Sequence, residues 1–267
     1  MRIAILGVGK IGEALLAGVL SGPGTSPGDV VICERVTARA SEIAERYGVR
    51  SVDDPAEAVT DADVVVLAVK PGDLLAVTTA TGTGLAQHAM VVSVAAGISA
   101  ASIESVLPPH TPVVRVMPNT PMLVGQGMSA LAPGGAAGPE HLDRAEALMA
   151  SVGRVVRVPE AQIDVVTAVS GSGPAYLFLV VEAMIDAGVL LGLPRPLATE
   201  LATQTALGAA TMLRETGEHP ALLREAVTSP GGTTAAALRE LENGGLRAAF
   251  YDALEACRDR AQDLARS

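Results

Sequence analysis

A glycine-rich segment with several hydroxyl groups lies near the C-terminus and could bind a small anion. It reads TSPGGTT at residues 228–234. The proline and two glycines at its centre would end any preceding helix and permit backbone conformations that other residues resist. Thr233 and Thr234 then start a new amphipathic helix, where free N–H groups and the helix dipole favour a negative charge. We therefore predict a pocket for a carboxylate or a phosphate at this helix start.

A second anion-binding segment of a different kind lies near the N-terminus. It reads GVGKIG at residues 7–12, directly after an apolar run and before a helical pattern. Gly7 suits a tight turn, Gly9 lets a pyrophosphate approach the backbone, and Gly12 lets the helix pack closely on the sheet. In this context the three glycines predict a dinucleotide-binding loop.

The residues that follow the second predicted strand bear on which dinucleotide binds. Glu34 stands there, and its carboxylate would accept a hydrogen bond from the ribose 2′-hydroxyl of NADH. Arg35 follows at once and Arg39 one turn later, and guanidinium groups suit the 2′-phosphate of NADPH. The residues leave NADPH and NADH both open, and we favour NADPH slightly.

Two further segments end predicted parallel strands, at the sheet edge where cofactors bind. AVKP at 68–71 carries Lys70, which could contact cofactor phosphate or ribose, and SVAAG at 93–97 has small residues that would let the nicotinamide ring approach. The predicted cofactor-binding residues are Gly7, Val8, Gly9, Lys10, Ile11, Gly12, Glu34, Arg35, Ala68, Val69, Lys70, Pro71, Ala95, Ala96 and Gly97.

These segments need an α/β sheet followed by helices to position them. Short runs rich in Val and Ile alternate with amphipathic stretches, which predicts a Rossmann-like, doubly wound parallel sheet for residues 1–160. The remaining residues, 161–267, predict an all-α domain for substrate binding and dimerisation. The predicted strands are 2–6, 30–33, 64–69, 91–95, 113–117, 128–132 and 155–158. The predicted helices are 11–21, 38–47, 140–152, 174–190, 195–215, 220–227, 233–242 and 246–265.

Composition narrows the possible partners. A formal net charge of −10 and an aromatic content of 2% argue against nucleic acid and anionic membranes as partners. The two cysteines lack metal-ligand spacing, so we expect no metal site. The N-terminus resembles no signal peptide, which predicts a cytoplasmic protein. The most apolar helix, at 175–193, contains Glu182 and Asp186 and is better interpreted as an interface helix than as a membrane span.

Six motifs in this order make the chain resemble the pyrroline-5-carboxylate reductase family over nearly its whole length. They are GVGKIG (7–12), AVKP (68–71), SVAAG (93–97), RVMPNTP (115–121), SGSGPAY (170–176) and TSPGGTT (228–234). The resemblance implies NAD(P)H-dependent reduction of the cyclic imine 1-pyrroline-5-carboxylate to L-proline, the last step of proline biosynthesis. It also implies a homodimer joined through the helical domain, with a decamer built from dimers as a larger form.

The same resemblance assigns roles in the substrate site. Ser229, Gly232, Thr233 and Thr234 match family positions that hold the substrate carboxylate. Thr234 also matches the position whose hydroxyl lies near the ring nitrogen, which makes it the catalytic candidate. Asn119, between two prolines, could orient the nicotinamide or line the substrate pocket, or could serve the turn alone.

Two other functions remain to be compared with this one. A related two-domain reductase of a hydroxy acid or of another imine is the first. A hydroxy-acid enzyme needs a general acid or base, often Lys or His on the first helix after the sheet, and residues 174–190 contain neither. A non-catalytic dinucleotide-binding scaffold is the second, and it would leave the C-terminal anion pocket without a purpose.

Overall fold

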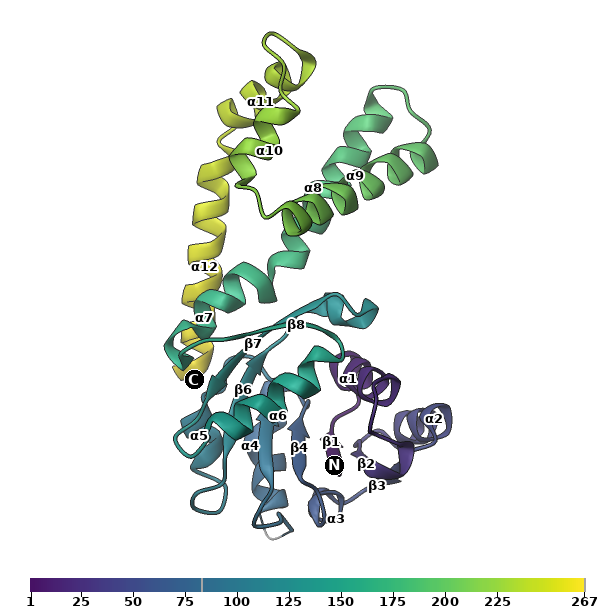
Figure 1. Cartoon of the computed structure of the whole chain (residues 1–267), viewed down its shortest axis with the longest axis vertical. Helices are drawn as coiled ribbons and strands as arrows, with labels where there is room; N and C mark the ends of the chain where they lie inside the picture. The colour runs from purple at the N-terminus through teal and green to yellow at the C-terminus, as the bar shows by residue number, and fades with distance from the viewer. Residues whose placement is uncertain (83, 267) are drawn as a thin grey trace. The chain divides into compact units, whose positions relative to one another are not determined.

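The computed structural model describes residues 1–82 and 84–266 and contains an eight-stranded sheet (Figure 1). Its strand order is β3-β2-β1-β4-β5-β6-β7-β8, and the first six strands run parallel, as in doubly wound dinucleotide-binding folds. The strand β7 is antiparallel to β6 and parallel to β8. The strands are β1 (Ile3–Leu6), β2 (Val30–Cys33), β3 (Arg50–Val52), β4 (Val64–Leu67), β5 (Met90–Ser93), β6 (Val113–Met117), β7 (Gly127–Pro133) and β8 (Gly153–Arg157).

Helices cover both faces of the sheet. One apolar cluster joins Ile3 and Ile5 to three helices, α1 (Lys10–Ser21), α2 (Thr37–Tyr47) and α6 (Pro139–Ala150). A second cluster joins Ala4 and Leu6 to the other three, α3 (Pro55–Val59), α4 (Pro71–Thr81) and α5 (Ala100–Glu104). Neighbouring residues of β1 thus point to opposite layers. Each fully buried Ile or Leu stabilises the fold by about 1.5–3 kcal/mol.

This architecture confirms the predicted fold class, and the strands predicted from apolar runs are present with ends shifted by two residues or fewer. The short strand β3 and the helices α3, α4 and α5 were not predicted. Pro71 looks like a break in the sequence, yet it stands at the first position of α4, where a helix tolerates proline.

The segment before the long apolar helix is itself helical, although the sequence predicts a helix start only at residue 174. A 3-10 turn (η3, Glu160–Gln162), the short helix α7 (Ile163–Val166) and a π-helical turn (η4, Thr167–Gly171) lead into α8 (Gly173–Leu190). Backbone groups of the SGSGP motif therefore continue a helix. The π turn gives it a local widening of a kind often found at functional sites.

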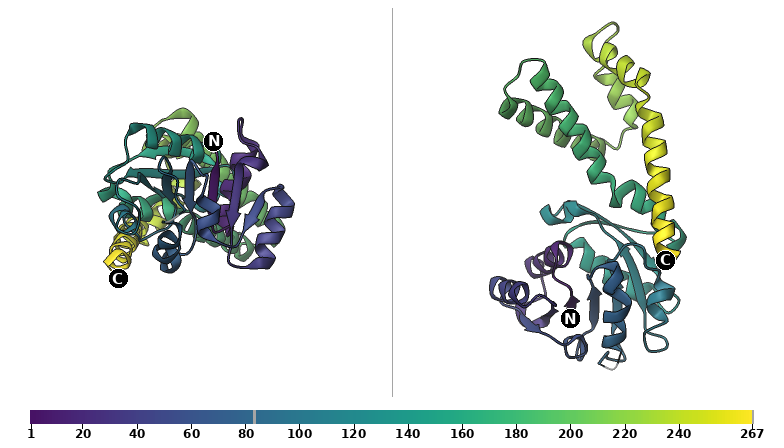
Figure 2. Two further views of the ribbon diagram at one scale, coloured as in Figure 1. Left: turned by 90° about the horizontal axis from the view of Figure 1, so that it is seen from below. Right: turned by 180° about the vertical axis from the view of Figure 1, so that it is seen from behind.

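Contacts within the chain divide it into two compact units. The first comprises Met1–Ser172 together with the chain from Cys257 onward, and the second is Gly173–Ala256. The second unit contains α8, α9 (Arg195–Thr216), α10 (Pro220–Ala226), α11 (Thr233–Asn243) and the first half of α12 (Leu246–Arg266). Helices α8 and α9 lie side by side as a hairpin (Figures 1 and 2). The domain boundary predicted near residue 160 stays a prediction.

Helix α8 leaves its apolar residues uncovered. None of its residues is buried, and Leu177, Phe178 and Leu179 are each more than 60% exposed. The helical run Glu160–Leu190 is also long and apolar enough, by length and composition, to cross a membrane. An exposed apolar surface of this kind indicates an interaction site.

Candidate cofactor and substrate sites

The loops after β1, β2 and β4 meet at the carboxyl edge of the sheet, beside the point where the strand order reverses. Gly7 N donates to Cys33 O at 2.8 Å, which joins the glycine loop to the end of β2. Ala68 N donates to Leu6 O at 2.8 Å, which joins the AVKP segment to β1. In open α/β sheets ligands bind at this edge, so the structure brings the predicted cofactor segments to the expected place.

Two of the three loop glycines are required by close packing and one leaves open space. Gly7 has φ +91°, and a Cβ there would lie 2.8 Å from Ala68 O. A Cβ at Gly12 would lie 2.1 Å from Gly7 O, so α1 can approach the loop only with glycine. A Cβ at Gly9 would meet no atom within 4 Å. The space beside Gly9 is where a diphosphate could approach the backbone.

The start of α1 fits a dinucleotide phosphate chemically. Gly9 is the N-cap residue and makes no side-chain capping bond, so the first N–H groups of the helix are available to an anion. Lys10, the first helical residue, is exposed and adds a positive charge. An open cradle, free N–H donors and a cation together match the pyrophosphate of a nicotinamide dinucleotide.

Alanine at Gly9 and at Gly12 should therefore have different effects. We expect Gly9→Ala to keep its melting temperature but to raise the Kd for NADP⁺ and NAD⁺ about tenfold, which corresponds to about 1.4 kcal/mol. Gly12→Ala should lower the free energy of unfolding by about 1–3 kcal/mol, because its Cβ overpacks the loop. Calorimetric titration and thermal unfolding measure the two effects. Gly28→Ala is the control, since its Cβ would meet its nearest atom at an ordinary 3.9 Å. An unchanged Kd in Gly9→Ala would contradict this assignment.

The backbone of Val8, a residue of the glycine loop, is held by hydrogen bonds at both its N–H and its carbonyl group. Its N–H donates to Glu34 Oε2 at 3.0 Å, and its carbonyl accepts from Arg39 Nε at 3.2 Å. The other carboxylate oxygen of Glu34 accepts from Val36 N at 3.1 Å. Glu34 and Arg39 thus fix the conformation of the glycine loop.

Arg39 is also paired with two acids, Glu13 of α1 and Glu42 of α2. Burial opposes ionisation of Glu13, but hydrogen bonds from Arg39 and Tyr47 outweigh it and hold the Glu13 pKa below its usual value. The sequence suggests Arg39 as a partner for a 2′-phosphate. In the structure its guanidinium is held instead in this network between the two helices.

The remaining predicted cofactor residues lie at the same edge. Lys70 is the N-cap residue of α4, and Pro71 begins that helix. Gly97, after β5, has φ +76°, a left-handed conformation that favours glycine. Arg35 is exposed and lies 3.7 Å from Asp73 of α4, a residue that the sequence analysis did not single out. Ser93, at the end of β5, is fully buried, and its hydroxyl has no hydrogen-bond partner among the described residues.

Asn119 connects two segments of the first unit through its side-chain amide. Its Nδ2 donates to Ser170 O in the π turn at 3.0 Å, and its Oδ1 accepts from Met128 N at 2.8 Å. Both ends of the amide are thus engaged within the chain, which gives Asn119 a structural role. Its contact with substrate or nicotinamide stays a prediction.

The TSPGGTT segment forms the start of α11, as its sequence predicts. Gly231 has φ +68°, Gly232 N donates to Ser229 O at 3.0 Å, and α11 begins at Thr233. Its N-cap residue is Gly232, which provides no side-chain capping bond, so the first N–H groups remain open to an anion. Ser229 and Thr233 are exposed and Thr234 is half-buried. The structure therefore brings the four predicted carboxylate-binding residues together in one turn.

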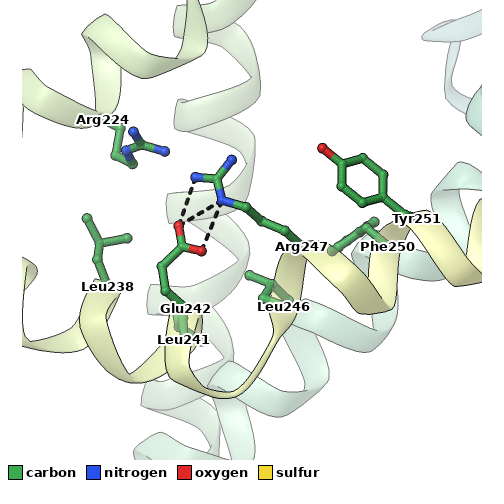
Figure 3. A pocket seen from close by; sticks show the side chains of 8 residues that line it. All are labelled: Arg224, Leu238, Leu241, Glu242, Leu246, Arg247, Phe250 and Tyr251. Atoms are coloured by element: carbon green, nitrogen blue, oxygen red, sulfur yellow. Dashed lines mark hydrogen bonds and ion pairs between the residues drawn. The ribbon is translucent and has the colours of Figure 1, made fainter.

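A separate pocket lies within the second unit, among α10, α11 and α12 (Figure 3). It has a volume of about 340 Å³ and is mainly apolar, with one charged pair in which Arg247 donates to Glu242 at 2.8–3.0 Å. It contains neither Ser229 nor Thr234. The lining residues are Arg224, Leu238, Leu241, Glu242, Leu246, Arg247, Phe250 and Tyr251.

The histidines, cysteines and acids of residues 1–82 and 84–266 bear on metal binding, and the cysteines also bear on thiol chemistry. No group of three or more His, Cys, Asp or Glu side chains in these ranges could hold a metal ion. Both cysteines are free. Burial and the nearby carboxylates raise the pKa of the Cys33 thiol to about 11, so Cys33 stays protonated and is a poor nucleophile at neutral pH.

Two family profiles match the chain. Residues 160–264 match a profile described as pyrroline-5-carboxylate reductase dimerisation. Residues 2–97 match one described as NADP oxidoreductase, coenzyme F420-dependent. The first covers all four residues of the C-terminal anion site, and the second covers the glycine loop and its partners at the sheet edge.

Individual relatives are similar along nearly the whole chain. A pyrroline-5-carboxylate reductase from Corynebacterium melassecola is 49% identical over 265 residues, which cover 98% of both chains. A solved pyrroline-5-carboxylate reductase structure from Coxiella burnetii is 37% identical, with a TM-score of 0.93 over 100% of this chain and 99% of that one. A Plasmodium falciparum pyrroline carboxylate reductase structure with NADP bound is 26% identical, with a TM-score of 0.89 over 99% and 98%.

Proposed function

This chain belongs to the pyrroline-5-carboxylate reductase family. We propose which of its residues bind the cofactor, which bind the substrate and which takes part in catalysis. It is an NAD(P)H-dependent oxidoreductase that reduces the C=N bond of 1-pyrroline-5-carboxylate to give L-proline. The observation that carries this function is the full-length similarity to these enzymes. Within the chain, one anion site for the cofactor and another for a carboxylate agree with it.

Reduction of a protonated imine by hydride transfer requires few catalytic groups from the protein. When bound, the reduced nicotinamide supplies a hydride to the imine carbon. The C=N π electrons then move onto nitrogen, so the protonated imine becomes a neutral amine, which takes a proton from solvent. No strong enzymic base is required, and the protein contributes mainly by positioning the imine carbon and excluding other orientations.

In our proposal the start of α11 binds the substrate. Ser229, Gly232 and Thr233 hold the carboxylate through hydroxyl and N–H groups at the uncapped helix N-terminus. The Thr234 hydroxyl hydrogen-bonds the ring nitrogen as its charge changes, which makes Thr234 the catalytic residue. Asn119, whose side-chain amide is held by Ser170 and Met128, is the remaining proposed substrate-binding residue. The open N–H groups of α11 and its left-handed Gly231 support this assignment.

The cofactor residues in our proposal are the glycine loop at 7–12, Glu34 and Arg35 after β2, the segment 68–71 after β4, and 95–97 after β5. Support comes from their common place at the carboxyl edge of the sheet and from the open space at Gly9. We propose NADPH as the preferred cofactor, with NADH also accepted. The exposed guanidinium of Arg35 is the feature that favours the 2′-phosphate.

The matched dimerisation profile makes this protein a homo-oligomer. We propose that two copies join through their helical units, and that dimers assemble further into a decamer in the cytoplasm, without nucleic acid or membrane. The uncovered apolar residues of α8 support a second copy as the partner. The pocket among α10, α11 and α12 adds further exposed apolar side chains, Leu241 and Tyr251 among them (Figure 3).

One assay tests the proposed activity. Purified protein is mixed with NADPH or NADH and with either 1-pyrroline-5-carboxylate or a set of 2-keto acids, and absorbance at the reduced cofactor band is followed. We expect oxidation of both cofactors with the imine, faster with NADPH at low concentration, and none with the keto acids. Turnover confined to a keto acid would mean that this chain is instead a hydroxy-acid enzyme with the same fold. Pure folded protein that leaves the imine unreduced would overturn the proposal.

A further inference from the structure

An ion pair connects the loop after β2 to the first turn of α4. Arg35 Nη1 lies 3.7 Å from Asp73 Oδ2, and the two side chains are 79% and 43% exposed. Arg35 directly follows Glu34, the residue at the ribose position. Asp73 lies three residues after Lys70 in the AVKP strand end. The pair therefore lies where the adenosine end of a dinucleotide would meet the protein.

The neighbouring guanidinium of Arg39 is already engaged. It bonds the Val8 carbonyl and pairs with Glu13 and Glu42, and its side chain is only 27% exposed. Recruiting it to a phosphate would break the network that holds the glycine loop. Arg35 can turn toward a new partner at the cost of one exposed ion pair, and such pairs are weak.

We propose that Asp73 weakens the preference for NADPH over NADH by competing with the 2′-phosphate for Arg35. This inference rests on the dinucleotide-binding function proposed above. With NADPH bound, Arg35 leaves Asp73 and pairs with the phosphate. With NADH bound, no phosphate is present, Arg35 stays on Asp73, and the Glu34 carboxylate accepts from the free 2′-hydroxyl.

Asp73 opposes the phosphate in two ways. It holds the guanidinium that the phosphate needs, and its own negative charge repels the phosphate dianion. Both effects act between exposed groups in high dielectric, so together they are worth about a twofold to fivefold change in affinity. Because NADH carries no charge at this position, neither effect touches it. Asp73 is thus a specificity residue that lowers the advantage of NADPH.

The test is direct binding of NADP⁺ and NAD⁺ to the full-length protein, measured by isothermal titration calorimetry at low salt. Asp73→Asn should lower the Kd for NADP⁺ about twofold to fivefold and leave the Kd for NAD⁺ unchanged. Arg35→Ala should raise the Kd for NADP⁺ about tenfold, as loss of a charged phosphate partner does, again without effect on NAD⁺. Combining the two substitutions should erase most of the gain from Asp73→Asn.

Asp61→Asn is the matched control. Asp61 is an exposed acid paired with Arg2 at 3.0 Å, close to the amino end of β1, so the variant makes the same change in net charge far from the cofactor loops. It should alter neither Kd. Melting temperatures establish that each variant is folded. The proposal is overturned if Asp73→Asn tightens both cofactors equally or neither, or if its full gain survives in the Arg35→Ala background. Failure of the proposed reductase activity would show separately, as normal dinucleotide binding without reduction of the imine.

Discussion

Thr234→Val should lower kcat for imine reduction about 100-fold while leaving the Kd for NADP⁺ unchanged. Valine keeps the shape of the side chain and removes the hydroxyl that we place at the ring nitrogen. The hydroxyl stabilises the nitrogen mainly as charge changes during the reaction, so its loss falls on kcat. Steady-state kinetics with varied imine and calorimetric titration of the cofactor measure the two quantities.

Two variants make this result specific. Thr234→Ser retains a hydroxyl and should recover most of kcat. Thr211→Val removes a hydroxyl from a half-buried threonine of α9, where it donates to Leu207 O at 2.8 Å, and should leave kcat unchanged. A Thr234→Val enzyme that lost cofactor affinity but kept kcat would contradict the assigned role.

Phe178→Glu should dissociate the homo-oligomer and abolish most activity at micromolar protein concentration. Phe178 is 67% exposed in the middle of α8, and a charge there must lose its water when a second copy covers the helix. Loss of a central aromatic anchor typically costs 2 kcal/mol or more, which raises the dissociation constant about 30-fold or beyond. Sedimentation velocity over a concentration series measures the shift, and activity should follow the associated fraction.

Val156→Glu is the matched control for this prediction. Val156 is 42% exposed on β8, outside the residues matched to the dimerisation profile, so the same chemical change should leave dimer formation intact. An unchanged sedimentation profile for Phe178→Glu would mean that α8 is covered by something other than a second copy.

The sequence predicted the doubly wound sheet because its strands are buried on both faces and consist of uninterrupted apolar runs. VVVL at β4 is one such run. The direction of β7 could not be predicted, since an apolar strand has the same composition whether it runs parallel or antiparallel to its neighbour. The helical turns from Glu160 to Gly171 were missed because the SGSGP motif at 170–174, with its two glycines and a proline, suggests that the helix begins there. Within this segment the Thr167 hydroxyl donates to Ile163 O, and from outside it the Asn119 amide donates to Ser170 O.

Among the predicted cofactor residues, local spacing was sufficient to predict how the glycines pack and insufficient to predict which charged residues pair. Gly7, Gly9 and Gly12 lie close together in the sequence, so their spacing alone predicts the tight turn, the open space and the close helix approach. Arg39 meets Glu13 across 26 residues and two helices, and its engagement becomes visible only in three dimensions. The pairing of Arg35 with Asp73 likewise depends on which strand ends lie together. Long-range pairs of this kind decide which of several plausible charges is available to a ligand.

The bare apolar surface of α8 also bears on how long each newly made chain survives. In the homo-oligomer that we propose, a second copy covers that surface, so a chain that has not yet associated leaves it exposed. Because association removes the free copy from this pool, resistance to heat must rise with protein concentration, by mass action. The thermal stability of this protein is therefore a function of its concentration.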